Sequence, residues 1–429
     1  MWLPLLFRQM LIHWKRNPKV VSFILTLLDV SSLIPCEYEE PNFSILDRDT
    51  WEFGKDYKNH VLSKFAPKFL ISLGIKTPVE IRNIRTKPHF AGKSGPNGPA
   101  TLSADLDVVS LFDDEILFSH IINYSVYIND CYYIDMLWRH IDLHESRDHP
   151  YWDIKESKAV MPINSKISYI DEPGGKRRII GILDYFTQGL LRPLHTYLIN
   201  SIGNIESDAT FNQELGFTQI LHNDHSNYFC FDWKAATENL PVQIAQEIIN
   251  TLFPGLGELW CKLLTDRIFH TPLGKHVLYR TGQPMGAYSS WAALDISHHF
   301  ILFICNWTIY KKPNFKNYKV LGDDIVIFDN KIADIYSDIL DLFEIPFSKT
   351  KTLISKDIFE FAKRIGYNNN QGSAIELSKV PLAGYYYFAT HSPKGFSLLF
   401  YCCEILKRGS FELDLLNLWE SRTQFKDIL

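Results

Sequence analysis

The sequence lacks the features of several common protein classes. Its seven cysteines form no CxxC pair and no Cys/His spacing typical of a zinc site, which argues against a zinc module and against a disulfide scaffold. No uninterrupted apolar run reaches the roughly 18 to 20 residues that cross a bilayer, so we expect a soluble chain without a membrane span. Internal repeats, low-complexity tracts and long Pro/Gly/Ser linkers are also absent. The chain is therefore predicted to fold as one interdependent unit.

The sequence also has little excess charge of either sign. Its formal net charge is -5, so any surface that binds a polyanion must be a local basic patch. The residues before Asp29 include no acidic side chain but four basic ones, namely Arg8, Lys15, Arg16 and Lys19. This pattern is similar to a mitochondrial transit segment and equally consistent with a basic first helix. Net charge alone thus neither supports nor excludes a nucleic-acid partner.

The first half of the chain shows a mixture of helix and strand signals. Pro and Gly crowd the stretch Lys87 to Ala100, which predicts a structured loop, and Val108 to Trp138 is predicted to be helical. Lys166 to Ile182 contains two strand-like pieces around the turn Pro173 to Gly175. Directly after this turn come three consecutive basic residues, Lys176 to Arg178.

The second half continues the mixed pattern. Tyr228 to Phe231 is a short apolar run, which predicts a buried strand that ends at Asp232, and a helix is predicted after Pro241. A longer helix is predicted from Ser289 to Tyr310, preceded by a glycine-rich loop, Gly282 to Gly286. Tyr318 to Phe328 is predicted to be a hairpin with Gly322-Asp323-Asp324 at its turn. The order of elements predicts an α+β fold.

The predicted turn Gly322-Asp323-Asp324 concentrates negative charge at the end of a sheet. Carboxylate oxygens suit Mg²⁺, and Asp232 on a neighbouring strand would let two ions sit roughly 3.5 to 4 Å apart. Gly-Asp-Asp alone is a weak motif, and an ordinary turn explains it equally well. The ordered set of basic hairpin, strand-end Asp232, glycine loop and Gly322-Asp323-Asp324 favours a metal site.

Further motifs occur in a fixed order along the chain. They are Lys93 to Gly98, Gly175 to Gly181 leading to Asp184 to Gln188, Asp208 to Gln213, Phe231 to Thr237, Gly282 to Trp291 with His298 and His299, Gly322 to Asp324, and Phe359 to Arg364. This series resembles the palm-domain RNA-dependent RNA polymerases and, within them, the mitovirus polymerases. The resemblance covers most of the chain, from Lys93 to Arg364.

The resemblance implies a right-hand polymerase fold. This is an α+β fold with fingers, a palm made of an antiparallel sheet packed on helices, and a short thumb. Residues 1–155 would form an N-terminal extension and part of the fingers, 156–364 the fingers/palm catalytic core, and 365–429 the end of the palm and a reduced thumb.

The resemblance also implies an activity, its cofactors and its partners. The activity is RNA-directed RNA polymerisation that replicates a mitovirus-like RNA genome by two-metal nucleotidyl transfer. The expected cofactors are two Mg²⁺ ions, with Mn²⁺ as an alternative. The expected partners are RNA template, RNA product and ribonucleoside triphosphates, no protein partner is evident, and the expected location is the mitochondrion.

Roles of individual residues follow from the same resemblance. Asp232 and Asp323 correspond to the metal ligands, and Asp324 assists them. The residues implied in nucleotide binding are Lys176, Arg178, Glu238, Gly286, Ser289 and Ser290. For the two serines, helix capping is an alternative. Lys351 resembles the lysine that protonates departing pyrophosphate, and a solvated lysine is its alternative. The side chains interpreted as packing residues are Trp233, Trp291, His298 and His299, and the two histidines are expected to be neither catalytic groups nor metal ligands.

One departure from the family pattern keeps other hypotheses open. The position that carries a second, sugar-sensing aspartate in the family is Glu238 here, and its extra methylene moves the carboxylate by about 1.5 Å. A truncated or decayed viral polymerase that binds RNA without catalysis is therefore one alternative. A reverse transcriptase, which shares the palm, is the other, although its usual turn has an aromatic residue before the aspartates.

Overall fold

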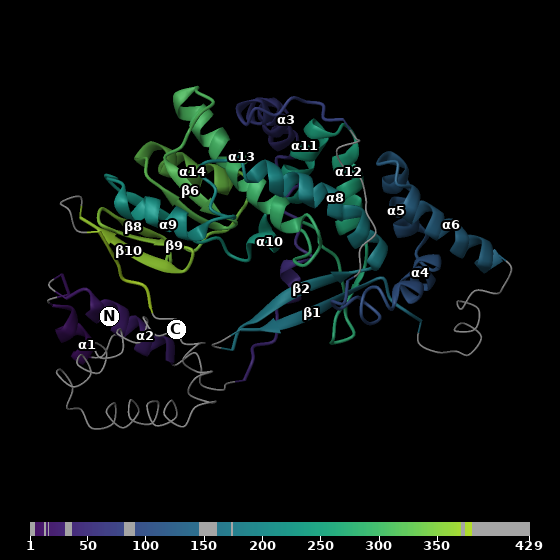
Figure 1. Cartoon of the computed structure of the whole chain (residues 1–429), viewed down its shortest axis with the longest axis horizontal. Helices are drawn as coiled ribbons and strands as arrows, with labels where there is room; N and C mark the ends of the chain where they lie inside the picture. Colours follow the sequence, from purple (N-terminus) through teal and green to yellow (C-terminus); the bar gives the residue numbers. More distant parts are fainter. Residues whose placement is uncertain are drawn as a thin grey trace. The chain divides into compact units, whose positions relative to one another are not determined.

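The computed structural model describes residues 5–12, 14, 15, 17–30, 37–80, 91–145, 161–172, 175–369 and 374–379. These residues form α-helices and mainly antiparallel sheets, which confirms the predicted α+β class (Figure 1). The chain divides into two compact units, Met1–Pro35 with Leu377–Leu429, and Cys36–Glu376. The prediction of one interdependent unit was therefore wrong. The predicted boundaries of fingers, palm and thumb stay predictions, and most of the thumb region lies outside the described residues.

In the smaller unit the structure describes two helices, α1 (Leu5–Leu11) and α2 (Lys19–Val30). They bury a small apolar cluster that consists of Phe7, Val20, Phe23 and Ile24. The ammonium of Lys379 lies 2.5 Å from a carboxylate oxygen of Asp29. Across the described residues of both units, no helix is long and apolar enough to span a membrane.

The central sheet of the larger unit has the strand order β6-β7-β3-β8. Its strands are β3 (Tyr228–Phe231), β6 (Tyr318–Leu321), β7 (Asp324–Ile327) and β8 (Leu353–Ser355), and all neighbours are antiparallel. All four residues of β3 are buried, because both faces of the sheet are covered. The predicted strand and hairpin are thus confirmed.

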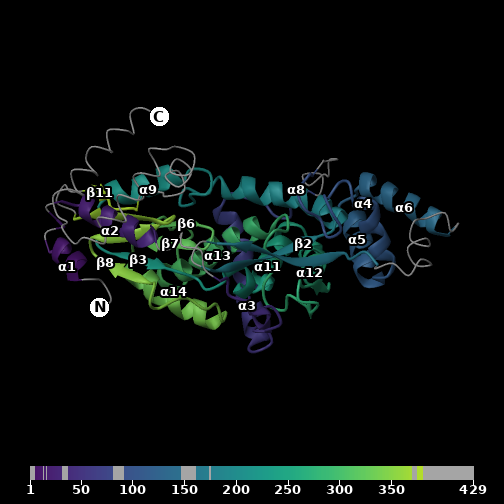
Figure 2. The same cartoon turned by 90° about the horizontal axis from the view of Figure 1, so that it is seen from below.

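Alternate residues of this sheet enter two different cores. Phe229 and Phe231 of β3 pack into the large core together with the helices α13 (Ser290–Tyr310) and α14 (Asn330–Leu342). Tyr228 and Cys230 pack into a second core with α9 (Gln213–His222) and β9 (Ile358–Phe361). This split follows from the two-residue period of a strand and requires apolar residues at every position of β3. The view in Figure 2 shows α9 and α14 on opposite sides of these strands.

Two further sheets complete the strand content of the described residues. The first has the order β2-β1-β4-β5, in which β1 (Ser165–Asp171) and β2 (Arg177–Leu183) form the predicted basic hairpin. Its other members are β4 (Phe269–His270) and β5 (His276–Val277). The second has the order β11-β10-β9, with β10 (Arg364–Asn368) and β11 (Ala374–Glu376). Pro173 and Gly174 of the predicted hairpin turn lie outside the described residues.

The remaining helices of the larger unit enclose these sheets. They are η2 (Phe43–Ile45, a 3-10 helix), α3 (Lys55–Ser72), α4 (Ala104–Phe112), α5 (Glu115–Tyr127), α6 (Cys131–Glu145), α8 (Tyr185–Ile202), α10 (Ala236–Asn239), α11 (Val242–Leu252) and α12 (Leu256–Thr265). The predicted helices after Pro241 and from Ser289 are confirmed as α11 and α13. Val108 to Trp138 is helical but divided among α4, α5 and α6. One break occurs where the Asp114 side chain accepts the Leu117 N–H and so begins α5.

A buried arginine joins α12 to the β1–β2 region. Arg267 is 2% exposed, and its guanidinium lies 2.6 Å from the buried carboxylate of Asp184, the residue that caps α8. It also donates to the hydroxyl of Ser165 at 2.6 Å and to the carbonyl of Asn164 at 3.0 Å. Such a network stabilises the fold only while every charged group keeps its partner.

Arg267→Met should therefore destabilise the protein strongly. The substitution leaves the Asp184 carboxylate buried without its cation, which typically costs about 3 to 5 kcal/mol in the free energy of unfolding. Chemical denaturation of the two proteins measures this difference. Lys316→Ala is the matched control, because Lys316 and its partner Glu206 are both exposed, so the unfolding midpoint should hardly move. Equal midpoints for all three proteins would contradict the structural role of Arg267.

Candidate active site

Strand pairing brings Asp232 and the Gly322-Asp323-Asp324 turn to one edge of the central sheet. Asp232 directly follows β3, and the turn connects β6 to β7. In the pairing of β3 with β7, Phe231 lies opposite Ile325, so Asp232 continues to the level of Asp324. Two segments far apart in the sequence thus deliver their carboxylates to the same end of adjacent strands, as the sequence pattern predicts.

The carboxylates at this edge influence one another electrostatically. Partial desolvation by surrounding protein raises the pKa of Asp323, although its side chain is exposed, and the charge of Asp232 raises it further. Desolvation, followed by the charges of Asp323, Glu360 and Asp232, raises the pKa of Asp324 to about 6. Raised pKa values of neighbouring acids show that their negative charges are not fully compensated by the surrounding protein. A bound cation would supply the missing positive charge.

Basic side chains lie near the acidic edge and near Glu238. The ammonium of Lys351 lies 3.3 Å from Asp232 Oδ2, and both side chains are largely open to solvent. The positive charge of Arg178 lowers the pKa of Asp323 and of Glu238, and the charge of Lys176 lowers that of Glu238. Lys176 and Arg178 are separated by two positions and therefore share one side of the extended β2 segment. The structure thus places the predicted basic residues around the predicted acids.

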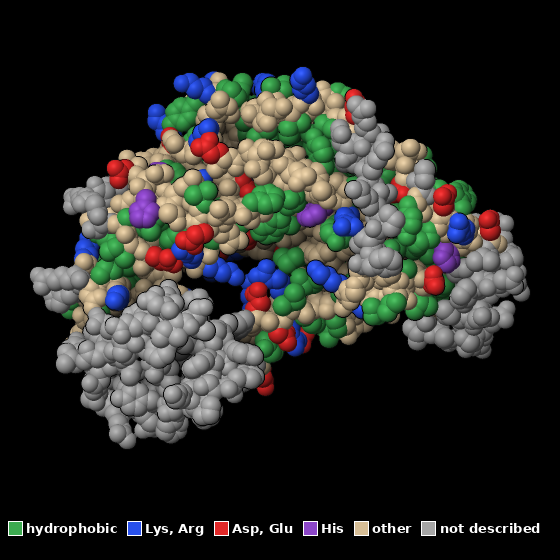
Figure 3. All heavy atoms as spheres, in the orientation of Figure 1, with side chains coloured by type: hydrophobic (Ala, Val, Ile, Leu, Met, Phe, Trp, Pro, Cys, Tyr) green, Lys and Arg blue, Asp and Glu red, His purple; other side chains and the backbone are tan. Residues whose placement is uncertain are grey.

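Arg177 points away from this group. It forms ion pairs with Asp171 at 3.0 Å and Glu40 at 3.2 Å. Figure 3 shows Lys and Arg side chains gathered around a hollow between the β1–β2 hairpin and the body of the larger unit. Arg177 and Arg178 thus belong to different ion pairs, and Arg178 is the one whose charge acts on Asp323 and Glu238.

The glycine-rich loop holds Glu238 against β2. A side chain at Gly282 would lie 2.2 Å from the Thr237 carbonyl oxygen, so only glycine fits. Gln283 donates its backbone N–H to the same oxygen at 3.0 Å. At the other end of the loop, the Gly181 N–H of β2 donates to the Met285 carbonyl at 2.7 Å. Glu238 is 6% exposed, and burial is the main cause of its raised pKa.

Gly286, Ser289 and Ser290 follow in the same segment. Gly286 has a φ of 110° and lies against the carbonyl of Gly181, so a side chain would clash there. Ser289 and Ser290 are both buried. Ser289 donates to the Tyr288 carbonyl and accepts from the Trp260 indole at 2.7 Å, while Ser290 donates to the Pro284 carbonyl at 2.8 Å. Nucleotide binding by these hydroxyls stays a prediction and requires them to change partners.

A chain of hydrogen bonds connects the segment after Asp232 to the residue before Asp323. The Trp233 indole N–H donates to the Tyr336 hydroxyl at 2.9 Å, and that hydroxyl lies 2.7 Å from His298 Nε2. His298 Nδ1 lies 2.7 Å from the Gly322 carbonyl oxygen. Burial lowers the pKa of His298 to about 3, so the ring is neutral, donates through Nδ1 and accepts through Nε2. Every donor in the chain then has an acceptor.

Gly322 is held on two further sides. The Asp295 carboxylate accepts the Gly322 N–H at 2.7 Å, and the Trp291 ring covers its Cα, where a methyl group would lie 2.4 Å from a ring carbon. Trp233, His298 and Trp291 are packing residues as predicted, but their roles in positioning the turn were missed. Residue spacing carries no signal for these roles, because the partners meet only in the tertiary structure.

Among the described residues, the side chains that lie close enough together to share a metal ion are not those of the acidic edge. Asp208, Asp295 and His299 place one ligand atom each within 4.8 Å of one another, whereas Asp232, Asp323 and Asp324 do not form such a group.

Tyr336→Phe should loosen the support of the turn. It removes one oxygen and leaves the Trp233 indole and His298 Nε2 buried without partners, at a cost of about 1 to 3 kcal/mol for each unsatisfied group. Denaturant unfolding measures this loss. Tyr310→Phe is the control, because the Tyr310 hydroxyl pairs with Asp329 at the surface, and its removal should change stability little. If both variants unfold at the wild-type denaturant concentration, the chain does not brace the turn.

Comparison with known proteins assigns the chain to a family of sequences. The family model described as "Mitovirus RNA-dependent RNA polymerase" matches residues 80–420. The RNA-directed RNA polymerase of Cryphonectria parasitica mitovirus 1 is 28% identical over 360 residues, which cover 82% of this chain and 43% of that protein. The chain thus spans less than half the length of this relative.

Other matches are shorter or more distant. Two uncharacterized mitochondrial proteins of Arabidopsis thaliana are 32% and 34% identical over 158 and 170 residues, or 35% and 37% of this chain and 76% and 67% of their own lengths. A solved structure of the RNA-dependent RNA polymerase of a human picobirnavirus is 11% identical, with a TM-score of 0.41 over 50% of this chain and 45% of that one.

Proposed function

The chain belongs to the mitovirus RNA-dependent RNA polymerase family, and on this premise we propose that it synthesises RNA on an RNA template. The observation that carries the proposal is the position of Asp232 beside the Asp323-Asp324 turn at one edge of the central sheet. Basic residues of β2 and the glycine-rich loop lie around the same edge. An RNA-binding protein without catalytic activity would not need this combination of acids.

The acidic edge fits a pair of divalent ions. Asp232 and Asp323 would hold them, with Asp324 assisting, because their side chains are exposed or half-exposed and the charge of Asp232 raises the pKa of both Asp323 and Asp324. When bound, two ions, which we propose to be Mg²⁺, lower the pKa of the attacking RNA 3'-hydroxyl and neutralise charge on the transferring phosphate. Hard carboxylate oxygens without imidazole or thiolate favour Mg²⁺ or Mn²⁺ over softer metals.

The basic side chains of β2 bind the nucleotide triphosphate in this proposal. Arg178 is partly exposed and pairs with Glu172 at 2.7 Å, a surface ion pair that a phosphate can replace. Its planar guanidinium suits two parallel hydrogen bonds to phosphate, whereas Lys176 acts as a point charge. Gly286, which has no side chain, lets the nucleotide approach the backbone beside β2.

Lys351 donates a proton to the departing pyrophosphate. Its ammonium already lies 3.3 Å from Asp232 Oδ2 and is 70% exposed, so it reaches the acidic edge and can exchange its partner. Proton donation to a leaving group requires this proximity. We also propose a mitochondrial location, which the names of the two Arabidopsis relatives support. The family assignment favours RNA synthesis over reverse transcription.

Asp323→Asn should abolish RNA synthesis. The substitution keeps the size of the side chain but removes the charge that holds the cation, so primer extension on an RNA template should fall at least about 100-fold under Mg²⁺ or Mn²⁺. Asp341→Asn, an exposed position on α14, is the matched control and should retain wild-type activity. Equal incorporation by the two variants would reject the metal assignment. Inactive wild-type protein would instead support the decayed-polymerase alternative.

Glu238→Asp should sharpen the choice between ribonucleotides and deoxyribonucleotides. The shorter side chain withdraws the carboxylate by about 1.5 Å to the position that the family uses for ribose, and we expect selectivity to rise about tenfold, or 1.4 kcal/mol. Competition between UTP and dTTP in primer extension measures this ratio. Glu238→Gln keeps the length and removes the charge. Unchanged selectivity in both variants would show that Glu238 does not contact the ribose.

A further inference from the structure

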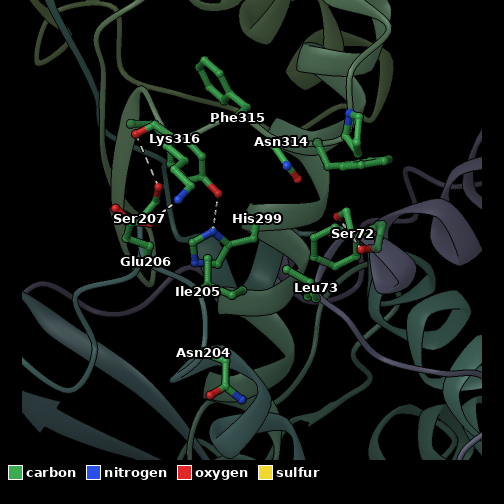
Figure 4. Close-up of a pocket in the computed structure, with 14 residues that line it drawn as sticks. Ser72, Leu73, Asn204, Ile205, Glu206, Ser207, His299, Asn314, Phe315 and Lys316 are labelled. Carbon is green, nitrogen blue, oxygen red and sulfur yellow. Dashed lines mark hydrogen bonds and ion pairs between the residues drawn. The ribbon is translucent and has the colours of Figure 1, made fainter.

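A cavity in the larger unit leads to His299 on the central helix α13. Its volume is about 210 Å³, and its walls come from the end of α3, the segment Asn204 to Ser207 and the segment Pro313 to Tyr318. Figure 4 shows the His299 ring at this cavity, near Ser207 and Lys316. Tyr318, which also lines the cavity, places its hydroxyl 2.8 Å from His299 Nδ1. The other ring nitrogen, Nε2, is directed to two acidic residues.

These acids are Asp208, from the loop before α9, and Asp295, one turn before His299 on α13. His299 Nε2 lies 3.3 Å from Asp208 Oδ2 and 3.9 Å from Asp295 Oδ2. Four-coordinate zinc with bonds of about 2.0 to 2.2 Å separates its ligand atoms by roughly 3.3 to 3.6 Å. The three side chains therefore already lie near the spacing that such an ion imposes.

One oxygen of this group is buried and has no partner. The Asp295 side chain is fully buried, and its Oδ1 accepts the Gly322 N–H, but its Oδ2 has no hydrogen-bond donor among the described residues. The other two side chains of the group do have hydrogen-bond partners. Asp208 Oδ1 accepts the Thr210 N–H at 2.8 Å. The Tyr318 hydroxyl bonds Nδ1 of His299, the ring nitrogen that faces away from the acids, and so orients the ring. A buried carboxylate oxygen without a donor is costly unless a cation lies beside it or a proton neutralises it.

The charge of the group points to the same conclusion. Two carboxylates are buried side by side, so the negative charge of one disfavours that of the other, and their ion pairs within the described ranges are with His299 alone. One divalent cation would neutralise both carboxylates and satisfy Asp295 Oδ2 in a single step. Imidazole is a poor ligand for Mg²⁺ but a good one for Zn²⁺ and similar ions.

We propose that Asp208, Asp295 and His299 form a buried site for a divalent transition-metal ion, with Zn²⁺ as its reference occupant. Since Asp295 also holds the N–H of Gly322, the ion fixes the turn that precedes Asp323. This site is separate from the all-carboxylate edge at Asp232 and Asp323, and its existence does not depend on the polymerase activity.

Metal analysis of the full chain tests the site directly. Protein stripped with a chelator, dialysed against Zn²⁺ and then against metal-free buffer should retain about one ion per chain. Asp295→Asn keeps an oxygen that can accept the Gly322 N–H but removes the charge, and zinc affinity should fall at least about tenfold. The double variant Asp232→Asn/Asp323→Asn is the control and should retain zinc at the wild-type level.

Cobalt binding tests the site in wild-type protein, so the result does not depend on whether a variant folds. Co²⁺ bound to wild-type protein should give the strong visible absorption of a four-coordinate nitrogen/oxygen site, and Zn²⁺ should displace it. Failure of wild-type protein to retain either ion would overturn the proposal. In that case Asp208 and Asp295 would share a proton in place of a metal ion. Zinc retention that is equal in wild type, Asp295→Asn and His299→Gln would overturn it as well, whatever the polymerase assay shows.

Discussion

The antiparallel pairing of β3 with β7 is the constraint on which the site depends. A shift of one residue would exchange the two faces of β3 and move Phe229 and Phe231 out of one core and Tyr228 and Cys230 out of the other. Both cores therefore specify the same register. This register sets Asp232 beside the Asp323-Asp324 turn, so the packing of apolar side chains determines where the negative charge accumulates.

The central helix α13 then determines the conformation of the turn. It is buried from Ser290 to Asn306 except at Trp291, and it contacts Gly322 through Trp291, Asp295 and His298. Trp291 covers the Cα of this glycine, Asp295 accepts its N–H, and His298 bonds its carbonyl oxygen. A turn that carries adjacent carboxylates is electrostatically strained, and support on three sides keeps it in place without a cation. Helix α13 thus positions the turn, whereas the register of β3 and β7 determines where the acidic side chains gather.

Local pattern was sufficient to predict the strands and helices that carry the site. Strand β3, the β6–β7 hairpin and helices α11 and α13 all show short apolar runs or helical spacing that the tertiary structure does not override. Aspartate caps were missed, so α4, α5 and α6 were predicted as one helical stretch. The hydrogen-bond chain through Tyr336 and the Asp208–Asp295–His299 group could not be predicted. Their members come from distant segments, and the neighbours His298 and His299 have identical side chains but different partners.

The most direct test of the account is to locate divalent ions at the acidic edge. Crystals of the protein with RNA, a non-reactive nucleotide and Mn²⁺ would reveal each ion by anomalous X-ray scattering. The account predicts strong peaks within coordinating distance of both Asp232 and Asp323, and their loss in Asp323→Asn. An acidic edge without a peak that contacts both carboxylates, in crystals where the nucleotide is bound, would contradict it.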